Sequence, residues 1–466
     1  MTDLETDYLV VGAGAVAMAF VDTLLAETNA DIVMVDEHHA PGGHWCDAYP
    51  FVRLHQPSAF YGVASLRLGE GRIDRTGWNA GYFELACGSE VAAHFDRAMR
   101  EVFLPSGRVR YFPMHRYEGE GRIRPLLGGS EFSVRAHRKT VDTTYLGVTV
   151  PSTHERPFSV ADDVACIPPN DLPRRAPDHR RFVLLGGGKT AMDAAIWMLE
   201  AGADPDAITW VIPRDGWVFD RAGTQPDARF FEDVFGRTAA QFEACAAATS
   251  VEDLFERLEA GKVVHRIFDD VFPTMFHFPT LSRAEAAELR RITRIVRGHR
   301  VRALGPGRMA FETGEESVPE DALFIDCTAA GATRRPTKPV FDGDLLTIQM
   351  VRLPQPTFSA ALIARLEATL ETDEEKNALA APTPLTDSIH DWPASMLVNM
   401  TNQYMWGRNP ELRAWMRECR LDGFGGMASG VGEDDQEKQA ILQRMKDAAF
   451  PAVENLQKLA AAQPAA

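Results

Sequence analysis

Two distant stretches of the chain share one pattern of hydrophobic and small residues. Residues 8–20 read YLVVGAGAVAMAF and residues 182–195 read FVLLGGGKTAMDAA. In each, a short apolar run typical of a buried strand leads into a glycine cluster and then into an apolar-rich stretch typical of a helix. A further apolar run follows at 32–35 and at 208–212. The pattern predicts the unit strand, turn, helix, strand twice, and with it an α/β fold built from two Rossmann-like, dinucleotide-binding domains.

The remaining stretches predict where these two domains begin and end. Residues 164–180 (VACIPPNDLPRRAPDHR) are rich in proline and charge, and we interpret them as the linker into the second unit. Residues 228–295 look helical, and short strands and turns follow around 300–332. The predicted organisation is a first dinucleotide-binding domain over 1–175, a second over 176–325 with a helical insert at about 228–295, a return to the first over 326–356, and a mostly helical region over 357–466.

The first glycine cluster fits the G-x-G-x-x-A form of the dinucleotide-binding fingerprint, with Gly12, Ala13, Gly14 and Ala17. Gly12 permits a tight turn, Gly14 lets backbone N–H groups approach a pyrophosphate, and Ala17 keeps the helix close to the sheet. The N-terminus of the helix then faces the negative charge of the pyrophosphate. Asp36 ends the second strand about 20 positions further on, where the fingerprint places the acid that binds ribose hydroxyls.

Composition and charge exclude several kinds of partner. The chain has 466 residues, 45% hydrophobic and 25% charged, as expected for a globular protein of two or three domains. A formal net charge of −17 argues against nucleic acid and against anionic membranes, since phosphate groups are bound by clustered Lys and Arg. The acidic N-terminus is unlike a signal peptide, and no apolar stretch approaches the ~20 residues of a membrane span. The six cysteines are widely spaced, which fits neither a disulfide framework nor a zinc site and favours reduced thiols in a cytoplasmic protein.

The segment after Asp36, HHAPGGHWCDAYPFVRLHQPS, resembles the flavin-containing and Baeyer–Villiger monooxygenases. In these families the strand-end acid is followed by a Gly-Gly-Thr-Trp segment and a Tyr-Pro-x-x-Arg stretch beside the flavin. This chain matches at Gly42, Gly43, Trp45, Tyr49, Pro50 and Arg53, has His44 in place of the threonine, and has His55 two positions after the arginine, where an acid is usual. The F-x-G-x-x-x-H fingerprint of the same families is absent.

The resemblance implies that the first site binds FAD. Asp36, with Glu37 beside it, is expected on the adenosine ribose, and the segment Gly43, His44 and Trp45 along the pyrophosphate and the ring. Arg53 and Gln56 are expected near the flavin. Packing in the core is an equally good explanation for Trp45, and a surface ion pair is the alternative for Arg53.

Two later segments of the chain are expected to lie beside the flavin again, as they do in the two-site plan of glutathione reductase. The small-residue turn after the strand at 322–326 contains Ala330 and Gly331, which resemble the turn that brings the chain back under FAD. Pro356 and Thr357 open a helix whose N-terminus, if aimed at the flavin, would stabilise the anionic reduced form; an ordinary packed helix is the alternative.

Disulfide reductases of the same plan need two cysteines close together beside the flavin. Cys46 is alone in that segment, and the next cysteine is Cys87. Dithiol chemistry is therefore not expected, and we interpret Cys46 as a small buried residue.

The second glycine cluster also fits G-x-G-x-x-A, with Gly186, Gly188, Lys189, Thr190 and Ala191. Its G-K-T letters suggest an ATP-type phosphate loop, but that motif needs a glycine where this chain has Val183. A dinucleotide site remains. In it, Lys189 on the first helical turn either touches a phosphate or is solvated.

The strand after this cluster ends in Pro213, Arg214 and Asp215. An arginine near the strand end accommodates the 2′-phosphate of NADP, whereas an acid favours NAD. Guanidinium groups bind phosphate through two parallel hydrogen bonds, and Arg221 is a candidate for a second such arginine. We predict NADPH as the electron donor, and Asp215 leaves NADH open.

Taken with the resemblance, these features predict an NAD(P)H-dependent FAD monooxygenase that uses O₂ and a small organic substrate. The nicotinamide reduces the flavin, and a C4a-(hydro)peroxyflavin transfers oxygen; the cofactor supplies this chemistry. The catalytic candidates are His55, as acid or base, and Gln56, as a hydrogen-bond donor, with a structural role open for both. The alternatives are a flavoprotein reductase or dehydrogenase without oxygen insertion, and a non-enzymatic FAD redox sensor that binds a protein partner. The substrate and the oligomeric state are not predicted.

Overall fold

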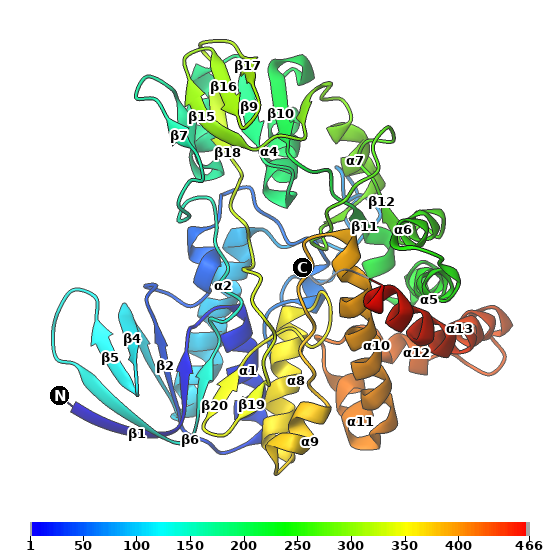
Figure 1. The fold of residues 1–466 in the computed structure, drawn as a ribbon. Helices are drawn as coiled ribbons and strands as arrows, with labels where there is room; N and C mark the ends of the chain where they lie inside the picture. Colours follow the sequence, from blue (N-terminus) through cyan, green and yellow to red (C-terminus); the bar gives the residue numbers. More distant parts are fainter. Residues whose placement is uncertain (1, 463–466) are drawn as a thin grey trace.

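Residues 2–462 are described in a computed structural model, in which two parallel sheets form separate parts joined by extended segments, with a group of helices at one side (Figure 1). The first sheet and its helices lie at the bottom of the view, the second sheet lies at the top, and the C-terminal helices stand on the right. The expected α/β fold class is confirmed.

The first sheet carries the first glycine motif at the end of its central strand. Its order is β19-β20-β6-β1-β2-β3, parallel from β20 to β3, and the antiparallel hairpin β4–β5 extends from β6. These strands are β1 (Thr2–Val11), β2 (Ile32–Asp36), β3 (Val109–Pro113), β4 (His115–Gly119), β5 (Arg122–Pro125), β6 (Phe132–Asp142), β19 (Phe341–Asp342) and β20 (Leu345–Thr347). The helices α1 (Ala15–Glu27), α8 (Pro356–Thr369) and α2 (Gly88–Arg97) pack on one face of this sheet and share its largest apolar core. Residues 17–25 of α1 are all buried, and all of them except Asp22 and Thr23 are apolar, as expected for a helix covered on every side.

The second sheet carries the second glycine motif in the same position. Its five strands, all parallel, run in the order β14 (Arg294–Arg297), β10 (Ile208–Ile212), β9 (Phe182–Leu185), β18 (Leu323–Asp326), β8 (Cys166–Ile167). Phe182 and Leu184 point into the core with α4 (Lys189–Glu200), whereas Val183 and Leu185 point into the core with a small sheet on the other face. That small sheet comprises β7 (Ser159–Val160), β15 (Val301–Gly305), β16 (Arg308–Phe311) and β17 (Glu315–Ser317).

The segment between β10 and β14 folds against the C-terminal helices. α5 (Arg237–Ala247) and α6 (Val251–Ala260) share one apolar core with α10 (Trp392–Arg408) and α13 (Gln436–Ala461). Figure 1 shows α5 and α13 side by side at the right of the molecule. The remaining elements here and beside the sheets are α3 (Leu172–Arg175), α7 (Arg283–Leu289), α9 (Asp373–Ala378), α11 (Pro410–Glu418), α12 (Gly425–Ser429) and a sheet of β11 (Val218–Asp220), β12 (Val264–His265) and β13 (Thr280–Leu281).

The expected strands at 32–35, 182–185 and 208–212 are observed within a residue or two. The expectations for residues 164–180 and 228–295 need correction. The stretch interpreted as a linker at 164–180 contains β8, an edge strand of the second sheet, and β7 at 159–160 also pairs with a strand of the second part. The insert at 228–295 is helical only in part, since β12 and β13 lie within it and β14 begins at its end. The region over 357–466 is mostly helical as far as the structure describes it; its last residues, 463–466, lie outside the described part. The domain limits themselves stay a prediction.

The chain passes twice between the two sheets, after β6 and after β18. The two passing segments touch through an antiparallel bridge between Thr149 and Gly331, where the Thr149 N–H donates to the Gly331 carbonyl at 2.9 Å. Within residues 2–462 we find no helix with the length and apolar character that crossing a bilayer requires.

Candidate functional site

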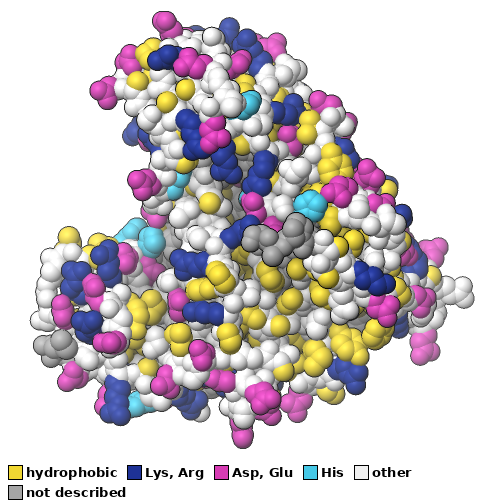
Figure 2. All heavy atoms as spheres, in the orientation of Figure 1, with side chains coloured by type: hydrophobic (Ala, Val, Ile, Leu, Met, Phe, Trp, Pro, Cys, Tyr) yellow, Lys and Arg dark blue, Asp and Glu magenta, His cyan; other side chains and the backbone are white. Residues whose placement is uncertain are grey.

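A cavity of about 680 Å³ lies where the two sheets, the two passing segments and the C-terminal region meet. Figure 2 shows the molecule hollowed between its upper and lower parts. The cavity wall contains ten of the predicted site residues: His44, Trp45, Arg53, His55, Gln56, Gly188, Lys189, Thr190, Ala330 and Gly331. The other predicted site residues lie off this wall: Gly12, Ala13, Gly14, Ala17, Asp36, Glu37, Gly43, Gly186 and Arg214. The structure thus brings three segments to one place. They are the loop beside the first motif, the second motif itself, and the return turn.

The first glycine motif is a close junction of three backbone segments. Gly12 has φ +105°, and a Cβ there would collide with the Thr143 hydroxyl at the end of β6. A Cβ at Gly43 would lie 2.9 Å from the Gly14 Cα, because the segment 42–43 packs directly on the motif. Gly14 then begins α1, which has neither a side-chain cap nor an acidic residue in its first turn. The N-terminal amides of α1 are therefore suited to an anionic group.

The predicted ribose acid, Asp36, lies beside this motif at the end of β2. It accepts hydrogen bonds from the Ala13 N–H (2.5 Å), the His38 N–H (2.7 Å) and the His38 Nδ1 (2.7 Å). His38 Nε2 lies 2.9 Å from Asp47, and the hydrogen bond to Asp36 is the main reason that the pKa of His38 is raised to about 9. Glu37 instead points to the surface and pairs with Arg116 at 2.9 Å. Sequence reasoning missed His38. The signal that could have found it is its place two positions after the strand-end acid, within hydrogen-bond reach of the Asp36 carboxylate.

The loop after the motif supplies aromatic and polar groups to the cavity. The Trp45 indole N–H donates to the Tyr61 hydroxyl at 2.8 Å, so this tryptophan lines the cavity and also packs on the core. Arg53 is exposed and donates to the Leu85 carbonyl at 3.2 Å. Burial, with the nearby charges of Lys189 and Arg221, holds the pKa of His55 well below its usual value. His55 is therefore a neutral ring at physiological pH.

The second glycine motif is closed on one side and open on the other. A Cβ at Gly186 would lie 2.7 Å from the Cys327 carbonyl oxygen, and one at Gly187 would lie 2.9 Å from the Arg214 carbonyl oxygen. A Cβ at Gly188 would meet no atom of the described chain within 4 Å. Gly188 is the N-cap of α4, which has no side-chain cap and no acidic residue in its first turn. The space beside Gly188 belongs to the cavity and is of the kind that a phosphate group fills.

Lys189 connects this motif to the first part of the molecule. Its ammonium group pairs with Asp193 one turn further along α4, and the Tyr49 hydroxyl donates to the same carboxylate at 2.7 Å. Burial raises the pKa of Asp193, and the Lys189 ion pair opposes that rise. Lys189 and Thr190 both line the cavity.

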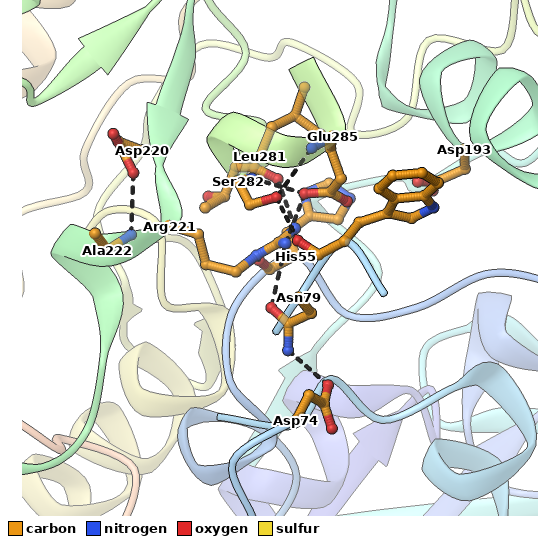
Figure 3. Close-up of polar contacts among 12 residues, drawn as sticks. His55, Asp74, Asn79, Asp193, Asp220, Arg221, Ala222, Leu281, Ser282 and Glu285 are labelled. Atoms are coloured by element: carbon orange, nitrogen blue, oxygen red, sulfur yellow. Dashed lines mark hydrogen bonds and ion pairs between the residues drawn. The ribbon is translucent and has the colours of Figure 1, made fainter. Parts of the chain in front are cut away.

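A buried polar network lies behind the cavity wall (Figure 3). Arg221 is 1% exposed; it pairs with Glu285 at 2.6 Å and donates to the His55 carbonyl and the Asn79 side chain at 3.2 and 3.3 Å. The expectation that Arg221 assists a nucleotide phosphate is wrong, because its guanidinium is committed to these partners inside the protein. Its role is to hold the backbone at His55 against the second part of the molecule.

Arg214, two residues after β10, has a carboxylate partner from far along the chain. Its Nη1 and Nη2 donate to the two Asp387 oxygens at 2.9 and 2.7 Å, and His277 Nε2 lies 2.9 Å from the same carboxylate. Asp215 pairs with Arg297 at 3.1 Å. Asp387 and His277 line the cavity, and sequence reasoning missed both.

Gln355 is a further residue that sequence reasoning missed. It immediately precedes α8, lines the cavity and is 4% exposed. Neither the oxygen nor the nitrogen of its side-chain amide has a partner among residues 2–462. The expected helix start at Pro356 is observed, and Thr357 ties it to the Phe60 carbonyl at 3.2 Å. A buried amide without a partner costs free energy unless a ligand or water completes its hydrogen bonds.

The return turn is open toward the same cavity. Gly331 has φ +68°, and a Cβ there would meet nothing in the described chain within 4 Å. Ala330 and Gly331 both line the cavity. Their small size leaves the backbone accessible, as close approach to a ligand requires.

Solved structures of flavoprotein monooxygenases share this fold. The polycyclic ketone monooxygenase of the thermophilic fungus Thermothelomyces thermophila is similar with a TM-score of 0.50 and 14% sequence identity, over 99% of this chain and 89% of that one. An open crystal structure of cyclohexanone monooxygenase has a TM-score of 0.49 and 12% identity, over 80% of this chain and 88% of that one. The chain has the fold of the two-domain flavoprotein monooxygenases, and the expected resemblance is confirmed at the level of the fold.

No protein-family model matches the chain. An uncharacterized protein of Mycobacterium tuberculosis (strain ATCC 25618 / H37Rv) is 44% identical over 456 residues, which are 98% of this chain and 84% of that protein. The chain belongs to the family of this mycobacterial protein.

Proposed function

We propose that this chain is an NAD(P)H-dependent FAD monooxygenase that acts with O₂ on a small organic substrate. One observation carries the proposal: the loop packed on the first glycine motif and the open side of the second glycine motif face a single cavity. A donor nucleotide held at the second motif and a flavin held at the first would meet there. This is what transfer of a hydride between two cofactors requires.

The residues around the first motif fit FAD. The amides of α1 and the segment 42–43 would hold the pyrophosphate, and Asp36, with Glu37 nearby, would accept from the adenosine ribose. The isoalloxazine has an edge of alternating carbonyl and N–H groups, and the side-chain amide of Gln355 is complementary to such an edge because it both donates and accepts. Ala330 and Gly331 would let the backbone approach the ring. When bound, FAD supplies electron storage and the activation of O₂.

The residues around the second motif fit a pyridine nucleotide. The open space at Gly188 would receive the pyrophosphate at the start of α4, with Lys189 and Thr190 on the first helical turn beside it. Arg214 would lie near the adenosine ribose. In the sequence, the arginine at this strand end indicates NADPH as the donor, with NADH as the other candidate.

The protein's own contribution at the reacting centre is positioning and exclusion of water. Gln56 presents an amide, Arg53 a permanent positive charge, and His55 a neutral imidazole that donates and accepts hydrogen bonds. Because its pKa is well below the usual value, His55 is not protonated at neutral pH. We therefore assign it the role of orienting the substrate or a cofactor by hydrogen bonds. Trp45, Tyr61 and Phe60 form an aromatic part of the wall that excludes water.

The cysteines bear on two further questions, which are dithiol chemistry and the location of the protein. Cys46 donates weakly to the Ala40 carbonyl at 3.6 Å, and the next cysteine along the chain is Cys87, so the proposal does not include dithiol chemistry. We also propose a cytoplasmic location, which rests on the wide spacing of the six cysteines along the chain. A reductase without oxygen insertion uses the same two sites, and experiment separates it from the monooxygenase.

The test starts with the purified full-length chain and its visible absorption spectrum. We expect bound flavin that bleaches on anaerobic addition of NADH or NADPH, and O₂ uptake that rises with an oxidisable small molecule in proportion to product formed. Bleaching with no product-coupled O₂ uptake across ketone, amine and sulfide panels favours the reductase. Flavin that does not bleach favours the sensor, and a chain that binds no FAD overturns the proposal.

A further inference from the structure

The end of β10 is the position that, in Rossmann-type domains, distinguishes NADH from NADPH. In Rossmann-type domains an acid at this strand end accepts from the ribose 2′-hydroxyl, whereas an arginine accommodates the 2′-phosphate. Arg214 occupies this place, and both of its terminal nitrogens donate to Asp387 at 2.9 and 2.7 Å. The tertiary structure therefore adds an acid to a strand end that, in the sequence, carries an arginine.

Asp387 is held in place by its backbone. Its N–H donates to Asp391 at 2.9 Å, and its carbonyl accepts from the Phe276 N–H at 3.3 Å. The next residues continue this attachment, since Ser388 forms a bridge with Met275 and the Ile389 N–H donates to the Thr274 carbonyl at 3.1 Å. These backbone contacts fix the position from which the Asp387 side chain reaches Arg214.

The charges around this point leave no excess of cations. Arg214 is balanced by Asp387, Arg297 by Asp215 (3.1 Å), and Arg334 faces Asp391 at 3.5 Å. His277 also faces Asp387, at 2.9 Å. The hydrogen bonds from Arg214 keep the pKa of Asp387 well below its usual value, so the carboxylate is charged at physiological pH. A 2′-phosphate placed here meets a fixed negative charge, whereas a 2′-hydroxyl meets a hydrogen-bond acceptor.

We infer that Asp387 makes the second dinucleotide site select NADH over NADPH, by accepting from the ribose 2′-hydroxyl and repelling a 2′-phosphate. The inference rests on the proposed function, because it takes the second glycine motif to be the donor's site. This inference reverses the preference for NADPH that Arg214 alone indicates. Arg214 acts as a positioning residue that orients the Asp387 carboxylate.

The test measures binding of two probes that carry no nicotinamide, ADP-ribose and 2′-phospho-ADP-ribose, to the full-length protein by calorimetry. We expect the wild type to bind ADP-ribose at least about tenfold more tightly, and Asp387→Asn to shift the ratio of the two dissociation constants toward the phosphorylated probe by about tenfold or more. Glu243→Gln is the matched control, because Glu243 forms an equivalent two-bond pair with Arg444 (2.8 and 2.8 Å) away from the cavity.

A wild type that prefers the phosphorylated probe overturns the inference whether or not Asp387→Asn folds, and so does a folded Asp387→Asn protein with an unchanged ratio. If neither probe binds the wild type, the proposed donor site itself is wrong and the inference falls with it. Circular dichroism establishes that the variants are folded.

Discussion

The Tyr49 hydroxyl donates a 2.7 Å hydrogen bond to the Asp193 carboxylate, and this bond joins the loop after the first glycine motif to the helix that begins at the second. Asp193 also neutralises Lys189, the first residue of that helix. One partly buried carboxylate therefore links the two parts of the molecule beside the cavity. A residue of the first part thus influences the charge at the second motif.

Removal of this bond is expected to destabilise the protein. Tyr49→Phe deletes a hydrogen bond to a partly buried charged group, and such a bond contributes about 1.5–3 kcal/mol. Tyr145→Phe is the control, because the Tyr145 hydroxyl donates to the Pro336 carbonyl at an exposed site. We expect urea denaturation to show the larger loss of unfolding free energy for Tyr49→Phe. Equal losses for the two variants would show that the link to Asp193 contributes no more than a surface bond.

Two neighbouring glycines of the second motif, Gly187 and Gly188, are expected to respond differently to replacement by alanine. At Gly188 a methyl group meets no protein atom within 4 Å, so Gly188→Ala should fold normally. The methyl group would occupy phosphate space, and we expect the affinity for ADP-ribose to fall by roughly a hundredfold. At Gly187 the same methyl lies 2.9 Å from the Arg214 carbonyl oxygen, so Gly187→Ala should lower the melting temperature.

Gly236→Ala serves as the control, since Gly236 also has open space around its Cβ position but lies away from the cavity wall. Its nucleotide binding should match the wild type, and its stability should not fall below that of the wild type, because Gly236 is in a helical conformation that alanine also adopts. A Gly188→Ala protein that binds ADP-ribose like the wild type would show that the nucleotide does not use this space.

Replacement of Gln355 is expected to change stability and flavin binding in opposite directions. The amide has no partner in the described protein, so Gln355→Leu relieves a buried unpaired group, which costs about 1–3 kcal/mol. The flavin-free variant should therefore melt at a higher temperature than the flavin-free wild type. The same change removes a hydrogen-bonding partner of the isoalloxazine edge, so FAD should be released more readily on dialysis.

Gln349→Leu is the matched control for this prediction. Gln349 is also 4% exposed, but its amide exchanges two hydrogen bonds with the Lys338 backbone at 3.2 and 2.7 Å. It should lower the melting temperature and leave FAD retention unchanged in the protein that remains folded. Loss of both stability and FAD in Gln355→Leu would indicate a purely structural glutamine.

His38 is expected to make stability depend on pH above neutrality. Its pKa is raised from 6.5 to about 9, chiefly by the hydrogen bond to Asp36. A raised folded-state pKa contributes stability that is fully present below pH 6.5 and is lost as the pH rises through about 9. The difference in unfolding free energy between wild type and His38→Gln should therefore shrink over this interval. Asp47→Asn, which removes one of the two carboxylate partners, should show a smaller pH-dependent difference; a constant difference for His38→Gln would contradict the prediction.

The local units of the fold were predictable from the sequence because the forces that form them act between near neighbours. Apolar runs at 8–11 and 182–185 bury on both sides and form strands, and Gly12 and Gly186 must be glycines where backbone segments meet. The helix starting at Pro356 follows equally local rules. The boundary near β8 was missed, because two strand residues in a proline-rich stretch carry too little pattern, and only pairing with β18 makes them a strand.

The character of the candidate site was decided by the tertiary structure. Arg221 carries the same charge as Arg214, but burial beside Glu285 makes it structural. Arg214 signals a phosphate site by its position in the sequence, yet Asp387, 173 residues further along, neutralises it. Gln355 looks like any polar residue before a helix, and only the packing around it leaves its amide buried and unpaired. Sequence patterns report the interactions of neighbours along the chain, whereas charge balance and hydrogen-bond completion depend on groups that folding brings together from distant positions.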